Sequence, residues 1–153
     1  MLFRSDALSR AGFVWVRYLV VDRAIHFTAA TAMVIATAPI HTAEACARSL
    51  RHLRSLGLVR LDDLESAALV AALDGVAARS VELFGSRTDP ASRGGDIDVL
   101  VLSTAPRFET SRLVASRFFM RCEERIDVVV LDPDNLTAAD EAFLRSLRRV
   151  KIA

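Results

Sequence analysis

The spacing of the apolar residues changes near residue 60, where one helical period gives way to alternating helix and strand patterns. Between residues 42 and 56 apolar positions recur at intervals of three and four, which gathers them on one face of a helix. These positions are Ala43, Cys46, Leu50, Leu53 and Leu56. Gly57 follows at the place of a helix C-cap, so we predict a helix over residues 42–56.

Two more helices are predicted before this one, over residues 6–22 and 27–38. The second is rich in alanine and stops before Pro39, because proline disfavours the helical conformation in the residue that precedes it. We therefore expect residues 1–60 to form a mainly helical N-terminal segment.

Three helices are predicted after residue 60, over residues 61–75, between residues 107 and 125, and over residues 137–150. Each of the first two carries an apolar face at helical spacing. The faces are Leu61, Leu64, Ala68 and Ala71 in one helix, and Phe108, Val114, Phe118 and Cys122 in the other. Thr137 is the expected N-cap of the last helix.

Three short apolar segments alternate with these helices: VELFGS, DIDVLVLS and IDVVVLD. The second and third are dense in the β-branched and aliphatic residues of buried strands. We predict an α/β (α+β) fold with a small mixed β-sheet flanked by helices, and a division into residues 1–60 and residues 61–153.

Composition and charge narrow the class of protein. The 153 residues are 52% hydrophobic, enough for a real core, and the formal net charge of +1 argues against a strongly basic nucleic-acid binder. The first 60 residues nevertheless carry eight arginines against three acidic residues, and the remainder is net acidic. We therefore expect residues 1–60 and residues 61–153 to have different functions.

Cysteine content and hydropathy indicate the compartment. The two cysteines are too few for a disulfide framework and lack metal-ligand spacing, so a reducing compartment, the cytoplasm, is expected. The most apolar stretch, residues 27–40, is shorter than the roughly 18 residues that suggest a membrane span. No basic segment with a cleavage pattern opens the chain, so we expect neither secretion nor membrane insertion.

Two aspartates at the start of a buried strand are the main chemical signal. The period of two along a strand turns Asp96 and Asp98 to the same face, while Ile97 points to the other. Two neighbouring carboxylates repel each other unless a cation lies between them, and Mg²⁺ prefers such oxygen ligands. Asp127 opens the next strand, so three acids could converge on a site for two metal ions.

A second signal lies just before these acids. Gly85 and Ser86 end a predicted strand, where glycine allows close approach of an anion and the serine hydroxyl can bind phosphate oxygens. We also predict that Arg87 binds the nucleotide, and Arg93 could add positive charge nearby. A phosphate-binding loop beside a metal site indicates a nucleoside triphosphate as substrate.

These residues resemble the signature of the minimal nucleotidyltransferase domain, in the polymerase-beta-like superfamily. The resemblance covers about residues 61–153 and rests on GS, nine residues, DID, and a third aspartate on a later strand. It implies that Asp96, Asp98 and Asp127 ligate two Mg²⁺ ions, and that Gly85 and Ser86 hold the triphosphate of ATP. It also implies that Asp127 helps to deprotonate an acceptor hydroxyl.

The loop departs from the family at two places. Gly95 stands where many relatives have serine or another polar residue, and Asp89 with Pro90 replaces a segment that is often basic and rich in glycine. All three expected carboxylates are present.

The resemblance also indicates a partner. Many small relatives are antitoxins that modify a helical ribonuclease toxin of the HEPN type, so we expect such a toxin's hydroxyl as acceptor of AMP. One alternative is a non-catalytic antitoxin module that binds a partner or DNA, because residues 41–61 loosely resemble the end of a helix-turn-helix unit. Another is a nucleotidyltransferase of small molecules, of the kind that modifies aminoglycosides.

Overall fold

The computed structural model describes residues 20–21, 24–25 and 42–153, and the chain divides into two compact units, Met1–Ile35 and Ala36–Ala153. In the first unit, β1 (Val20–Val21) and β2 (Ala24–Ile25) pair antiparallel. The predicted helix over residues 6–22 is therefore wrong at Val20–Val21, where two β-branched residues favour a strand. The rest of that helix and the one over residues 27–38 lie outside the described residues.

The second unit begins with the predicted helix, α1 (Thr42–Ser55). Gly57 has a positive φ of 68°, and Leu58 N–H donates to Leu53 C=O at 2.9 Å, the hydrogen bond of a helix that ends on glycine. Cys46 and Leu50 are buried in the core that α1 shares with the sheet, whereas Leu56 is 57% exposed, so its place on the buried face is wrong. Helix α1 thus belongs to the same compact unit as residues 61–153.

The next helix, α2 (Asp63–Ala72), starts from a capping box in which Asp62 and Glu65 bond to each other's main-chain N–H groups. Its buried apolar face is Ala68, Leu69 and Ala72. The predicted face holds for Leu61 and Ala68. Leu64 is 58% exposed and Ala71 is only partly buried, because the helix turns Glu65, Ala68 and Ala72 to the core instead.

Helix α3 (Arg107–Phe119) buries Val114 and Phe118 as predicted, and Cys122 beyond its end is also buried. Phe108 departs from the predicted stripe. It is 64% exposed, and the guanidinium of Arg112 lies over its ring, 5.4 Å from the centroid.

The last helix, α4 (Ala138–Ser146), has the predicted N-cap, Thr137, in a capping box with Asp140. It ends four residues before its predicted end at Val150, because Leu147 is extended and Arg149–Lys151 forms a strand, β6. Antiparallel pairing to β3 (Ser80–Phe84), with Phe84 opposite Arg149, replaces the helical hydrogen bonds. Ile152, directly after β6, is fully buried.

Four strands form one mixed sheet in the order β5-β4-β3-β6. The central pair, β3 and β4 (Ile97–Leu102), is antiparallel, and β5 (Ile126–Leu131) runs parallel to β4. The predicted α/β class, with a mixed sheet flanked by helices, is confirmed.

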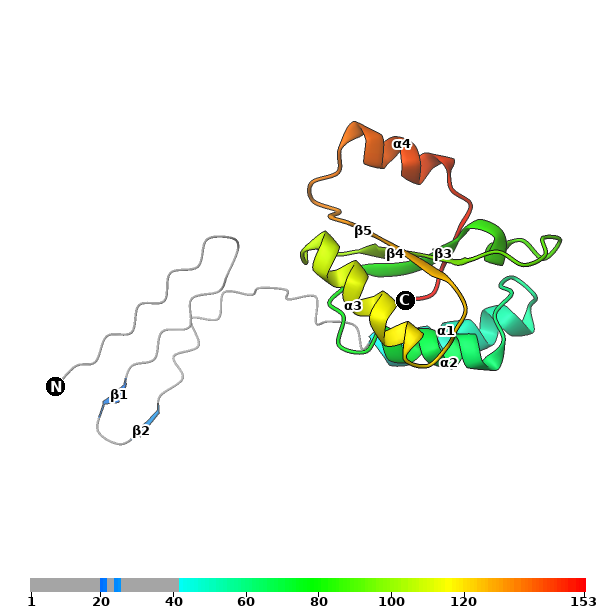
Figure 1. Cartoon of the computed structure of the whole chain (residues 1–153). Coiled ribbons are helices and arrows are strands. Elements are labelled where there is room, and N and C mark those ends of the chain that lie inside the picture. The colour runs from blue at the N-terminus through cyan, green and yellow to red at the C-terminus, as the bar shows by residue number, and fades with distance from the viewer. Residues whose placement is uncertain (1–19, 22–23, 26–41) are drawn as a thin grey trace. The chain divides into compact units, whose positions relative to one another are not determined.

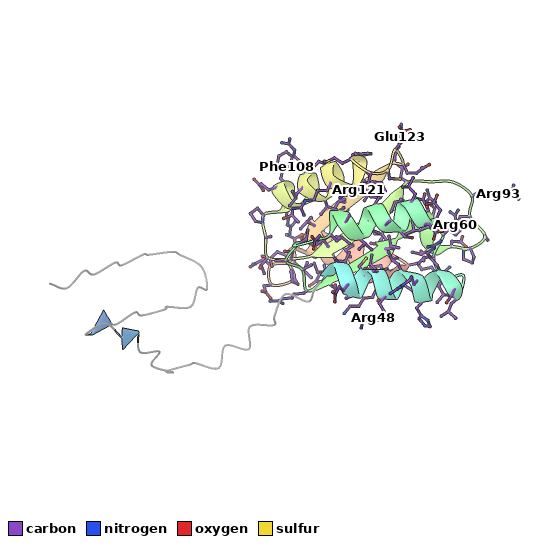
Figure 2. All side chains as sticks on the ribbon, turned by 90° about the horizontal axis from the view of Figure 1, so that it is seen from below. Arg48, Arg60, Arg93, Phe108, Arg121 and Glu123 are labelled. Atoms are coloured by element: carbon purple, nitrogen blue, oxygen red, sulfur yellow. The ribbon has the colours of Figure 1, made fainter. Side chains whose placement is uncertain are left out.

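The side chains of each strand alternate between two layers. One face packs against α1, α2 and α3, which lie side by side in Figure 2 and form the main core with Leu83, Val99 and Val130. The other face carries a smaller cluster, in which Phe84, Leu100 and Leu131 pack against side chains around α4. Figure 1 shows α4 on the side of the sheet opposite α1 and α2. Within the described residues, no helix has the length and apolar character needed to cross a bilayer.

Candidate active site

Three predicted acids come together where β4 and β5 begin. Asp98 in β4 pairs in register with Asp127 in β5, and on its other side with Phe84, the last residue of β3. Partners in register project to the same face, so both carboxylates lie on the face that carries α4. Asp96 precedes β4 directly, two residues from Asp98.

The charges of two of these acids affect the ionisation of the third, Asp98. Burial raises the pKa of the Asp98 carboxyl above its usual value, and the neighbouring charges of Asp127 and Asp96 raise it further. Within the described part of the chain, none of the three carboxylates has a hydrogen-bond or ion-pair partner. Other acids do: Glu65 pairs with Arg87 at 2.8 Å, and Glu82 pairs with Arg149 at 2.9 Å. The fold therefore gathers negative charge here without neutralising it.

Gly85 brings the predicted phosphate loop against Asp98. It begins the short 3₁₀ turn Gly85–Thr88 with φ of 69°, a left-handed conformation that favours glycine. A Cβ at this position would collide with Asp98 Oδ2 and lie 3.0 Å from Asp98 Cγ. The main chain that would hold a phosphate thus touches the carboxylate that would hold a metal ion.

Gly95 has a similar geometric role on the other side of the loop. Its φ is 93°, and a Cβ here would collide with Ser86 Oγ and lie 3.1 Å from Ser86 Cβ. Close packing against Ser86 therefore accounts for glycine at this departure from the family pattern.

Asp89, part of the other departure, orders the loop from within. Its carboxylate accepts from Ala91 N–H and from Ser92 Oγ, each at 2.9 Å, and these two bonds lower its pKa. The negative charge of Asp89 is thus partly satisfied by the loop itself.

Arg87, predicted to bind the nucleotide, has other partners here. Its side chain is 11% exposed and forms the ion pair with Glu65. It also donates to the carbonyl oxygens of Gly95 and Arg60, both at 3.1 Å. Arg87 therefore links the loop to α2, and this geometry leaves its guanidinium little capacity for a phosphate. Arg93 is exposed on the loop (Figure 2).

Two basic residues near the site carry no recognisable signal in the sequence. Arg60, between α1 and α2, donates to three carbonyl oxygens of the loop, each at 3.0 Å. Arg149 lies opposite Phe84 on β6, a strand that the sequence presented as helix. No periodic signal marks Arg60, because its partners are main-chain atoms distant in sequence.

The three acids are of the chemical type that binds Mg²⁺, but their side chains alone do not form a complete coordination site. Carboxylate oxygens are its preferred ligands, yet no three His, Cys, Asp or Glu side chains among the described residues stand close enough to hold a metal ion together. Mg²⁺ commonly uses one or two carboxylates and completes its shell with substrate phosphates and water. The arrangement therefore fits metal ions that arrive with a nucleotide.

Comparisons with known proteins add no relative. No protein-family model, curated protein or solved structure matches this chain. The likeness to minimal nucleotidyltransferases therefore rests on the motifs and on the site described above.

Proposed function

We propose that the protein is a Mg²⁺-dependent nucleotidyltransferase that moves AMP from ATP to a hydroxyl acceptor. The observation that supports this most is the unpaired trio of Asp96, Asp98 and Asp127 beside the Gly85–Ser86 turn. Among the described residues Glu65 and Glu82 have arginine partners, whereas the three site acids have none, and the charges of Asp127 and Asp96 raise the pKa of Asp98. Such an arrangement costs stability, and a bound cation would offset that cost.

Each residue has a role in this proposal. Asp96 and Asp98 would hold the metal ions, which would supply positive charge to neutralise the phosphate oxygens. Gly85 main chain and the Ser86 hydroxyl bind the phosphates. The acceptor oxygen forms a bond to the α-phosphorus as the bond to pyrophosphate breaks, and Asp127 receives the acceptor's proton.

A hydroxyl on a partner protein is the acceptor that we propose, in keeping with an antitoxin that modifies a HEPN-type toxin. We place this activity in the cytoplasm, because Cys46 and Cys122 are both unpaired and buried. Burial raises the pKa of the Cys46 thiol to about 12, which keeps it protonated and unreactive.

Nucleotide binding by the purified full chain tests the first step. Isothermal titration with ATP should show one site that requires Mg²⁺, and Asp96→Asn and Asp98→Asn should each weaken binding by about tenfold or more. Glu109→Gln, at an exposed position in the first turn of α3, is the matched control. Equal binding by wild type and Asp98→Asn would contradict the proposal.

The non-catalytic binding module has one observation in its favour. A groove of about 720 Å³ runs between α1 and α2, and its lining includes the apolar side chains of Ala47, Leu50 and Val70. Charged residues of both signs also line it: Arg51, Arg54, Arg121, Asp63 and Asp74. A partner helix with an apolar face and charged residues of both signs would fit it. Alanine at all three acids should leave such binding intact, so this series separates the two functions.

A further inference from the structure

Arg60 holds the loop between β3 and β4 from the side of α2. Its Nε donates to Asp89 C=O, and its NH2 group donates to Ser86 C=O and Gly94 C=O, all at 3.0 Å. Its own N–H donates to Arg87 C=O at 2.8 Å. One side chain thus joins both ends and the middle of the segment 85–95.

Arg87 extends this support. It donates to Gly95 C=O and to Arg60 C=O, and its ion pair with Glu65 ties it to the capping box of α2. A guanidinium suits this task, because it offers five donors in a fixed plane, whereas the ammonium of lysine is a compact point charge.

The two arginines also set the direction of the loop's peptide groups. The carbonyl oxygens of Ser86, Gly94 and Gly95 point to guanidinium groups, and in a trans peptide the following N–H points the opposite way. The N–H groups of Gly95 and Asp96 consequently turn away from the arginines. Neither has a hydrogen-bond acceptor within the described part of the chain.

These free donors lie next to the predicted phosphate-binding residue. Gly95 packs against Ser86, and Asp96 opens the acidic pair. Successive free N–H groups beside a hydroxyl form an anion-binding concavity. Asp96 thus supplies one of the free donors and one of the unpaired acids, which suits a phosphate that carries its own metal ion.

We propose that Arg60 is a positioning residue, which holds the segment 85–95 so that the N–H groups of Gly95 and Asp96 bind phosphate oxygens together with Ser86. The inference rests on the proposed function for the identity of the ligand. It assigns Arg60 no contact with the nucleotide, and it adds two main-chain donors to the phosphate site.

Arg60→Lys tests this, because lysine keeps the charge and loses the planar set of donors. We expect two effects: amide hydrogen exchange within residues 85–95 becomes faster, and the Kd for Mg²⁺–ATP rises by about tenfold with the binding stoichiometry unchanged. Partial unfolding would instead lower the stoichiometry. Arg48→Ala, which removes an exposed arginine of α1, is the control and should change neither quantity.

The outcomes separate the two proposals. If the wild type binds no nucleoside triphosphate, the proposed function fails, and the exchange rates still decide whether Arg60 orders the loop. If Arg60→Lys exchanges and binds as the wild type does, positioning by Arg60 is wrong. If Arg60→Lys weakens binding while loop exchange is unchanged, Arg60 acts through its own contact with the nucleotide, which also overturns the inference.

Discussion

At Asp98, the folded state favours a neutral side chain, whereas the proposed chemistry requires an ionised carboxylate. It lies between Phe84 and Asp127 in the sheet, with Gly85 against its carboxylate. Burial and two like charges raise its pKa, so the ionised form is less stable in the folded chain than in the unfolded one. Retaining a carboxylate here makes sense if it has a cation to bind.

Asp98→Asn should therefore stabilise the metal-free protein. Since the pKa is raised in the folded state, stability falls as the pH rises from the ordinary value of 3.8 through the raised pKa of the folded state. Most of the carboxylate remains solvated, so the gain should not exceed about 1 kcal/mol. Urea unfolding at pH 7 with a chelator measures it.

The advantage of Asp98→Asn should shrink as the pH is lowered toward 4, because the wild-type carboxyl then becomes protonated in the folded state. Glu123→Gln, at an exposed position after α3, serves as the control and should stay within about 0.5 kcal/mol of the wild type. A loss of stability in Asp98→Asn at pH 7 would show that Asp98 has a structural partner.

Among the helices and strands, features that depend on local sequence patterns could be predicted, whereas features that depend on long-range contacts could not. The strands β4 and β5, the N-cap of α4 and the meeting of Asp98 with Asp127 follow from short patterns in the sequence. The strand β6 does not, because only its pairing with β3 distinguishes Arg149–Lys151 from a further helical turn. The role of Arg60 could not be predicted for the same reason, since its hydrogen-bond partners lie more than 25 residues away in the sequence.

The segment after α4 should matter for stability despite its short length. Ile152 is fully buried in the main core, so Ile152→Ala should lower the free energy of unfolding by about 2–5 kcal/mol. Lys151→Ala, exposed on the neighbouring position of β6, should have an effect below about 0.5 kcal/mol. Chemical denaturation of both variants measures the contrast, and equal stabilities would mean that this end of the chain does not close the core.

At the scale of the whole compact unit, the two candidate functions occupy different elements. The acids lie on the face of the sheet that carries α4, and the groove lies between α1 and α2 on the layer that covers the other face. The sequence indicated the first through DID and GS. It could not indicate the groove, because the same small apolar residues would serve equally well in a closed core.

Transfer of a nucleoside monophosphate can be distinguished from transfer of a phosphoryl group by the position of the label in ATP. The full chain is incubated with Mg²⁺, a HEPN-type partner protein, and ATP labelled at either the α- or the γ-phosphate. The partner should acquire the α-label and not the γ-label, and Asp98→Asn should abolish the transfer. Transfer of the γ-label, or α-labelling that is unchanged in Asp98→Asn, would contradict the proposed function.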